Sequence, residues 1–468
     1  VDVGVGLDRA GRCHQRLPGD LATEDALAVL VRGDATEDVD LDRLEVEELH
    51  ERVDCVLGHD GKLPSAPVST DSTIHRTFPD GFVWGTATAA HQIEGGNWNN
   101  DWWAWEHTPG SPCAEPSGDA CDSWHRGDED VALVADMGLG SYRFSFEWSR
   151  IEPEEGEWSR ASVDHYRRQC EALRAHGIEP TVTFHHFTTP RWLADRGGWE
   201  DPATADRFAA FCGRLAGEVG DVIGRACTIN EPNIVATIGW RLGAFPPGRR
   251  DGDLRLRVND VFVDAHRKAV DAIRAGAPGV PVGLTLSMTD YQAVDGGEER
   301  TARMRRVMED VFLEATDGDD FLGVQTYSRL RIGPDGILGA EDGVPELDMG
   351  YELWPQSLEA CLRRAWAYTG GNVPLLVTEN GIGTTDDSQR VAYVHAALEG
   401  VLRALADGVD VRGYTYWSLL DNFEWAYGYR PRFGLVAVDR ETFARMPKPS
   451  SAWYREVVKA NALVAPAT

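Results

Sequence analysis

Eight short apolar segments that alternate with amphipathic segments constrain the fold of this 468-residue chain more than any other feature. The apolar segments have the length and composition of buried strands, and they lie at residues 82–90, 141–148, 179–187, 225–230, 281–288, 321–327, 374–378 and 411–419. Helical periodicity marks residues 128–137, 161–176, 205–219, 258–275, 298–315 and 387–406. These alternations predict an α/β fold, a single (β/α)8 TIM barrel. An open doubly wound sheet is the alternative, although no glycine-rich phosphate loop follows any predicted strand.

The first 74 residues differ in composition from the rest of the chain. They carry 17 acidic and 7 basic residues and have only weak helical periodicity, at 21–31 and 41–57. A stretch rich in Pro, Ser and Thr at 64–73 then predicts a linker. We therefore expect two parts, an acidic N-terminal extension with its linker at 1–74 and a barrel at 75–468. A small appended helical piece is an alternative for the extension, whose residues indicate no function.

The balance of charges limits the partners of the chain. A net charge of −30 argues against nucleic acid and anionic membranes, because both would repel this surface. The eight cysteines show no zinc-site spacing, although Cys113 and Cys121 flank a loop and leave a disulfide open. No apolar leader and no run of about 20 apolar residues is visible, so we expect a cytoplasmic protein. The residues predict no oligomeric state.

Two glutamates stand at the ends of predicted strands, where a barrel of this kind places its chemistry. Glu231 follows the strand at 225–230, and Glu379 follows the strand at 374–378. A single glutamate at such a position would more often form a structural salt bridge at the end of the strand, because buried carboxylates need a charged partner or a functional role. Two of them suggest cleavage of an acetal, in which one carboxyl protonates the departing oxygen and the other captures the sugar. This chemistry needs no metal and no cofactor.

Other polar and aromatic residues gather at the same strand ends. Arg143 and Tyr327 are placed to keep a nucleophilic carboxylate ionised, although Arg143 alone is equally a structural ion pair. Alone, His186 would be a hydrogen-bonded core histidine, and a metal pair with His185 is disfavoured because adjacent strand residues point to opposite faces. The candidates for contact with the hydroxyls and faces of a sugar ring are Gln92, His186, Asn230, Trp417, Glu424 and Trp425.

Five stretches carry recognisable motifs in chain order. They are FVWGTATAAHQIEG at 82–95, YRFSFEWSRI at 142–151, TINEP at 228–232, VTENG at 377–381 and YWSLLDNFEW at 416–425. Together they resemble the motifs of the family 1 glycoside hydrolases, the β-glucosidase family, and the resemblance covers residues 78–458. TINEP is similar to that family's acid/base motif, and VTENG is similar to its nucleophile motif.

The resemblance implies a retaining β-glycosidase with Glu231 as acid/base and Glu379 as nucleophile. It also implies that Tyr327 orients the nucleophile and that Asn230 holds the sugar 2-hydroxyl. The remaining sugar contacts that it implies are Gln92 and Glu424 at the distal hydroxyls, with His186 and Trp425 beside them and Trp417 under the ring. The expected substrates are β-glucosides and short β-linked oligosaccharides, as in cellulose degradation. A β-galactosidase or β-fucosidase preference, or a non-catalytic sugar-binding relative, is the alternative.

Two positions depart from the family pattern. The family commonly has His-Trp after the third strand, where this chain has His186 and Phe187. It commonly has Asn-Tyr-Tyr at the sixth strand, where this chain has Gln-Thr-Tyr at 325–327. These departures leave the depth of the pocket and its fine specificity open. Tyr351 and Trp354 are candidates for the aglycone side.

Overall fold

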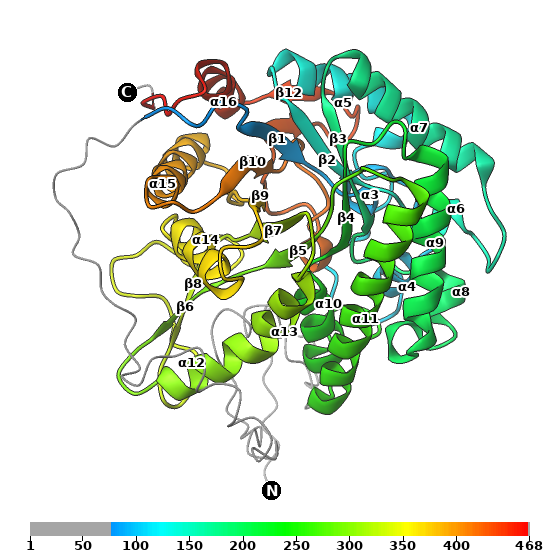
Figure 1. Cartoon of the computed structure of the whole chain (residues 1–468), viewed down its shortest axis with the longest axis horizontal. Coiled ribbons are helices and arrows are strands. Elements are labelled where there is room, and N and C mark those ends of the chain that lie inside the picture. Colours follow the sequence, from blue (N-terminus) through cyan, green and yellow to red (C-terminus); the bar gives the residue numbers. More distant parts are fainter. Residues whose placement is uncertain (1–75, 467–468) are drawn as a thin grey trace, which may run out of the picture.

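The computed structural model describes residues 76–466, and within them eight parallel strands form a closed barrel (Figure 1). The barrel strands are β1 (Val83–Ala87), β2 (Ser141–Ser145), β3 (Glu179–His185), β4 (Arg225–Asn230), β5 (Val282–Ser287), β7 (Phe321–Gln325), β9 (Leu375–Glu379) and β10 (Val411–Trp417). Because β1 pairs with both β2 and β10, the sheet has no free edge. The predicted TIM barrel is confirmed, and the open sheet is excluded. The proposed extension at 1–74 lies outside the described residues.

Each predicted strand corresponds to a barrel strand, but several predicted ends run too far. β1 ends at Ala87, because the apolar run continues into the short helix α3 (Ala90–Ile93). β2 ends at Ser145 and is followed by another short helix, α6 (Trp148–Ile151). The residues beyond the strands are as buried as the strands themselves, so apolar character alone does not mark where the sheet stops.

Helices surround the barrel, as the alternating pattern predicts (Figure 1). The longer ones are α5 (Ser123–Asp136), α7 (Arg160–Ala175), α9 (Ala203–Val219), α11 (Gly252–Gly276), α14 (Ser357–Tyr368), α15 (Asp387–Ala406) and α16 (Pro449–Ala460). Polar caps fix where some of them begin. The side chain of Ser159 accepts a hydrogen bond from the Ser162 amide before α7, and Asp386 caps α15 in the same way. The sequence pattern missed α14 and α16.

One predicted helix is broken in the structure. The segment predicted at 298–315 consists of α12 (Glu298–Arg305), a π-helical turn at η3 (Arg306–Asp310) and α13 (Val311–Leu313), followed by the 3-10 turn η4 (Glu314–Thr316). Glu309 lies inside the π turn, fully buried, and its Oε1 accepts a hydrogen bond from the Thr289 backbone amide at 2.9 Å. The turn thus brings a carboxylate to the end of β5, which helical periodicity does not reveal.

Short elements build the mouth of the barrel at the carboxyl ends of the strands. β6 (Asp290–Ala293) and β8 (Arg329–Ile332) pair in parallel and continue the paths of β5 and β7 away from the barrel (Figure 1). The helix after β4 consists of α10 (Pro232–Ala236) and the π-helical η2 (Thr237–Leu242). The other short elements are α4 (Asp101–Glu106), α8 (Arg191–Ala194), η1 (Gly198–Glu200), η5 (Trp425–Tyr427), β11 (Val436–Val438) and β12 (Arg445–Pro447).

Three further expectations bear on the described residues. Cys113 and Cys121 are free thiols, so the disulfide that the sequence left open is absent. Within residues 76–466, no helix has both the length and the apolar character of a membrane span. No three His, Cys, Asp or Glu side chains in that range are grouped in a way that would hold a metal ion.

Candidate active site

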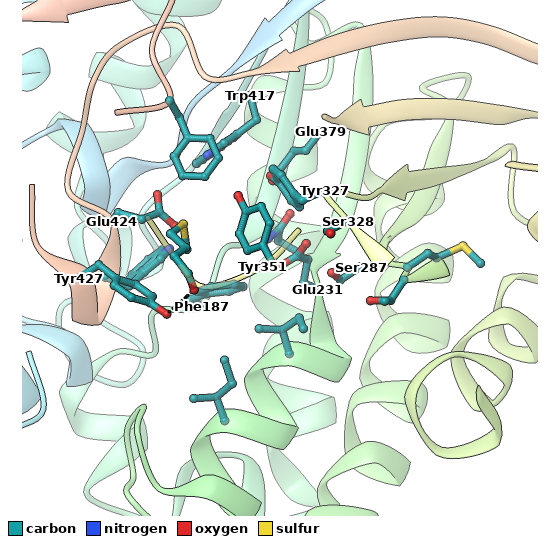
Figure 2. Close-up of a pocket in the computed structure, with 18 of the residues that line it drawn as sticks. Phe187, Glu231, Ser287, Tyr327, Ser328, Tyr351, Glu379, Trp417, Glu424 and Tyr427 are labelled. Atoms are coloured by element: carbon teal, nitrogen blue, oxygen red, sulfur yellow. Dashed lines mark hydrogen bonds between the residues drawn. The ribbon is translucent and has the colours of Figure 1, made fainter. Parts of the chain in front are cut away.

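A cavity of about 230 Å³ opens at the carboxyl-terminal mouth of the barrel (Figure 2). Most of the predicted site residues line it, and they come from the ends of five different strands or the loops that follow them. These lining residues are His186, Asn230, Glu231, Tyr327, Glu379, Trp417, Glu424 and Trp425. Arg143 and Gln92 do not line the cavity but hydrogen-bond to residues that do. The structure therefore brings all ten candidates together.

Each carboxylate oxygen of Glu379 accepts a hydrogen bond from a different residue. Arg143, inside β2 and 1% exposed, donates from Nη1 to Glu379 Oε1 at 2.5 Å. The Tyr327 hydroxyl donates to the other oxygen, Oε2, at 2.6 Å. Burial raises the pKa of Glu379, but the Arg143 charge and the Tyr327 hydrogen bond act in the opposite direction. The Arg143 guanidinium and the Tyr327 hydroxyl thus favour the anionic form of Glu379 against the effect of burial.

Arg143 also links Glu379 to the next strand-end residue. Its Nη2 donates to Asn230 Oδ1 at 2.5 Å, and Gln325 Nε2 donates to the same oxygen at 2.9 Å. The Asn230 amide nitrogen lies 3.2 Å from His186 Nε2. These contacts orient the amide, so Asn230 donates to His186 and its side chain cannot rotate without losing them.

His186 is a neutral histidine at the cavity. Burial and the Arg143 charge lower its pKa well below the usual value. Since Nε2 accepts from Asn230, the ring hydrogen is assigned to Nδ1. Nδ1 is buried and has no hydrogen-bond partner in the described chain. His185 faces the other way and packs edge-on against Trp199, with ring centroids 5.0 Å apart, as strand alternation predicts.

Glu231 has a different environment from Glu379. Burial raises the pKa of Glu231 well above its usual value, and the charge of Glu379 raises it further. The Ser287 side chain, at the end of β5, hydrogen-bonds to Glu231 and partly offsets this. Oε1 of Glu231 is buried without a hydrogen-bond partner among the described residues. Of the two carboxyls, Glu231 is therefore the one whose surroundings favour the protonated form more strongly.

Aromatic rings and a third carboxyl form another wall. The His186 ring is nearly parallel to Trp417 and to Trp425, with centroids 5.9 and 6.2 Å apart. Gln92 Nε2 donates to the Phe423 carbonyl at 2.8 Å and to Glu424 Oε2 at 3.3 Å. Burial, together with the Glu379 charge, raises the pKa of Glu424 to about 8. Gln92 Oε1 is buried and unpaired in the described chain, so this wall offers polar atoms next to flat apolar faces.

Three residues that line the cavity have left-handed backbone conformations. They are Phe187, Glu231 and Trp425, with φ of 70°, 44° and 50°. Pro232, at the first position of α10, disfavours the right-handed helical conformation at Glu231. Left-handed conformations are uncommon for residues with bulky side chains and cluster at functional sites.

Sequence reasoning missed part of the lining. Ser287, Ser328, Ile234 and Ile238 all line the cavity, and the four-residue spacing of the two isoleucines behind a strand-end glutamate was a usable indication. Other missed lining residues are Phe245, Met288, Leu330, Met349, Tyr427 and Phe433. Of the two aglycone candidates, Tyr351 lines the cavity, whereas Trp354 is not among its lining residues and packs against Arg329, whose guanidinium lies 3.5 Å from its ring centroid.

An eight-stranded parallel barrel whose mouth holds two buried glutamates in unlike surroundings is typical of a glycoside hydrolase of the two-carboxylate class. The model of the family "Glycosyl hydrolase family 1" matches residues 74–323 and 324–463. The chain therefore belongs to glycosyl hydrolase family 1, and it is an enzyme that hydrolyses O-glycosidic bonds.

Relatives of known name cover most of the chain. Beta-glucosidase A of Acetivibrio thermocellus is 32% identical over 443 residues, which are 82% of this chain and 99% of that protein. Thermostable beta-glucosidase B of Thermobispora bispora is 36% identical over 448 residues, with 84% and 93% covered. The crystal structure of the beta-glycosidase BGL167 is 48% identical and superposes with a TM-score of 0.77, covering 84% of this chain and 99% of that one.

Proposed function

We propose that the chain is a retaining β-glucosidase that cleaves β-glucosides and short β-linked oligosaccharides by double displacement. The observation that carries this proposal is the asymmetry between the two carboxyls. Glu379 has a cation and a hydroxyl on its oxygens, whereas Glu231 has an unpaired buried oxygen and a strongly raised pKa. Double displacement needs such a pair, one carboxylate to attack and one acid to donate a proton.

The first step uses both carboxyls at once. A carboxylate oxygen of Glu379 bonds to the anomeric carbon while the glycosidic C–O bond breaks. The proton of Glu231 passes to the departing oxygen, which leaves as an alcohol. Arg143 and Tyr327 hold Glu379 ionised and oriented before the attack.

The second step reverses these roles. The Glu231 carboxylate takes a proton from a water molecule, whose oxygen bonds to the anomeric carbon as the bond to Glu379 breaks. Two inversions at the same carbon restore the β-configuration. Glu231 is then protonated again, and Glu379 is again an anion.

The other site residues would bind the sugar. Asn230 and the Nδ1–H of His186 would donate to ring hydroxyls, and Glu424 with Gln92 would accept hydrogen bonds from the distal ones; the unpaired buried atoms of His186 and Gln92 support this. Trp417 and Trp425 would cover the apolar faces of a pyranose. Relatives named β-glucosidases support glucose as the sugar, and we place the enzyme in the cytoplasm, acting on oligosaccharides from cellulose among other β-glucosides.

A second sugar preference has one specific observation in its favour. A bifunctional beta-D-glucosidase/beta-D-fucosidase of Bifidobacterium breve is 32% identical over 455 residues, which are 81% of this chain and 98% of that protein. Fucosides lack the 6-hydroxyl, so their cleavage would depend less on Glu424 than that of glucosides.

A panel of p-nitrophenyl glycosides tests the proposal. We expect the highest kcat/KM on the β-glucoside, lower values on the β-galactoside and β-fucoside, and no cleavage of the α-glucoside. Proton NMR of early product should show β-glucose before mutarotation. Early α-glucose would contradict double displacement, a higher rate on another β-glycoside would change the sugar, and no cleavage at all would indicate a binding protein.

A further inference from the structure

The two sides of the cavity differ around Glu231. In Figure 2, Glu424 and Trp417 lie on one side of Glu231, while Ser287 and Ser328 lie on the other. If the sugar ring occupies the side of Trp417 and Glu424, the group that leaves with the proton of Glu231 must occupy the side of Ser287 and Ser328. The chemistry of this second side then decides which leaving groups the enzyme accepts.

Apolar side chains dominate that second side. Ile234 and Ile238 present one face of the α10–η2 helix, three and seven residues after Glu231. The β6–β8 pair, which continues β5 and β7 outward, adds Leu330. Met288, which follows Ser287 directly, is a further apolar residue of the lining.

The polar groups on this side are largely engaged already. The Nε and Nη2 of Arg329 donate to the two carboxylate oxygens of Glu352 at 2.5 and 3.1 Å. Nη2 also donates to Glu341 at 2.5 Å, and Nη1 donates to Gln292 at 3.1 Å. The Ser328 hydroxyl donates to the Glu352 carbonyl at 2.6 Å. A ligand that approached Arg329 and Ser328 would therefore find few free donors on these two residues.

A sugar and a hydrocarbon would therefore bind this side of the cavity with different affinities as leaving groups. A second glucose brings several hydroxyls that must give up water, and each one left unpaired in the cavity weakens binding. An alkyl or aryl group gains affinity from the same wall, because it removes apolar surface from water. We propose that the preferred aglycone is an apolar alkyl or aryl group rather than a second sugar. This inference rests on the proposed β-glucosidase activity and specifies its substrate class.

The rates on a series of alkyl β-glucosides from methyl to hexyl test the inference. Their leaving alcohols differ little in acidity, so the series isolates contact with the aglycone wall. We expect kcat/KM to rise by about two- to fourfold for each added methylene that the wall covers. A series that is flat from methyl to hexyl would overturn the inference, although cleavage of p-nitrophenyl β-glucoside would still support the proposed function. No cleavage of any β-glucoside would overturn both.

A matched pair of variants locates the effect. Leu330→Asn keeps the approximate size of a side chain that lines the cavity and makes it polar, so the hexyl-to-methyl ratio of kcat/KM should fall by about two- to fourfold. Leu338→Asn makes the same change on an exposed side chain that does not line the cavity, close to the same strand pair. Its ratio should equal that of the wild type. If Leu330→Asn kept the wild-type hexyl-to-methyl ratio, or if both variants lowered it equally, Leu330 would not belong to the aglycone wall.

Competition for the glycosyl-enzyme compares a hydrocarbon with a sugar directly. Starting from dinitrophenyl β-glucoside, every reaction passes through the same intermediate on Glu379, and then water or an added alcohol takes the glycosyl group. The alcohol oxygen bonds to the anomeric carbon, its proton goes to Glu231, and the bond to Glu379 breaks. At equal concentrations, hexanol should yield more glycoside than glucose yields disaccharide. More disaccharide than hexyl glucoside would refute the preference.

Discussion

Replacing Tyr327 by phenylalanine should move the acidic limb of the pH profile of kcat/KM to higher pH. The Tyr327 hydroxyl donates to Glu379 Oε2 at 2.6 Å, and this bond favours the charged carboxylate, so it lowers the pKa of Glu379. Activity requires Glu379 as an anion and is lost as the pH falls through that pKa. Without the hydroxyl the pKa is higher, so the loss begins at a higher pH.

The size of the shift follows from the strength of one hydrogen bond to a charge. Such a bond contributes about 1.5–3 kcal/mol, and 1.36 kcal/mol corresponds to one pKa unit, so we expect a shift of about 1–2 pH units. On the acidic limb each unit reduces kcat/KM by about tenfold. Because Glu231 and Glu379 interact, the limb reports the first ionisation of the pair.

The assay is kcat/KM for p-nitrophenyl β-glucoside between about pH 4 and 9, with buffers that overlap and constant ionic strength. Tyr427→Phe is the matched control, since Tyr427 also lines the cavity but donates to the Met349 carbonyl at 3.2 Å. Its acidic limb should stay near that of the wild type. If Tyr327→Phe left the limb in place or moved it to lower pH, Tyr327 would not be what keeps Glu379 ionised.

Three further predictions concern the carboxyls and the extension. Azide should restore turnover of both carboxyl variants, giving the β-glycosyl azide with Glu231→Ala and the α-glycosyl azide with Glu379→Gly. If proton NMR showed the two anomers reversed, the roles of Glu231 and Glu379 would have to be exchanged. The enzyme should prefer glucosides to their 6-phosphates by about a hundredfold or more in kcat/KM, because a phosphate dianion would enter a cavity that holds no cation among its described lining residues other than the engaged Arg329 and that already contains the charge of Glu379. Similar values on the two nitrophenyl substrates would contradict this. A chain that begins at Asp71 should fold and keep its activity, and a soluble but inactive truncated protein would instead give residues 1–70 a part in the site.

The barrel was predictable because its strands are short, largely buried segments that alternate with amphipathic ones, and this alternation can be read without knowing which strands pair. The β6–β8 pair was not, since Asp290–Ala293 and Arg329–Ile332 mix polar and apolar residues at the edge of the mouth. The π turn at Arg306–Asp310 was hidden for a related reason, because its residues continue the helical pattern. Local sequence patterns therefore predicted the barrel strands below the site but not the short segments that surround the mouth of the barrel.

The candidate residues were predictable as a set, but their contacts were not. Glu231 and Glu379 were found from their positions at strand ends, and the structure brings both to the cavity. That Gln325 donates to Asn230, 95 positions away, depends on the register of the barrel, which periodicity does not specify. Likewise, Ser287 looks like an ordinary strand residue until the fold places its hydroxyl on Glu231.

The left-handed backbone at Phe187, Glu231 and Trp425 has a consequence for how this protein can evolve or be engineered. Each such residue costs about 1–3 kcal/mol, so three of them consume a sizeable part of a net stability of about 5–15 kcal/mol. Glycine or asparagine at these positions would relieve the cost and raise the melting temperature. The same changes would remove an aromatic wall or the acid itself. A screen for heat resistance alone would therefore select more stable but inactive variants. Stabilising substitutions are better sought far from the mouth of the barrel.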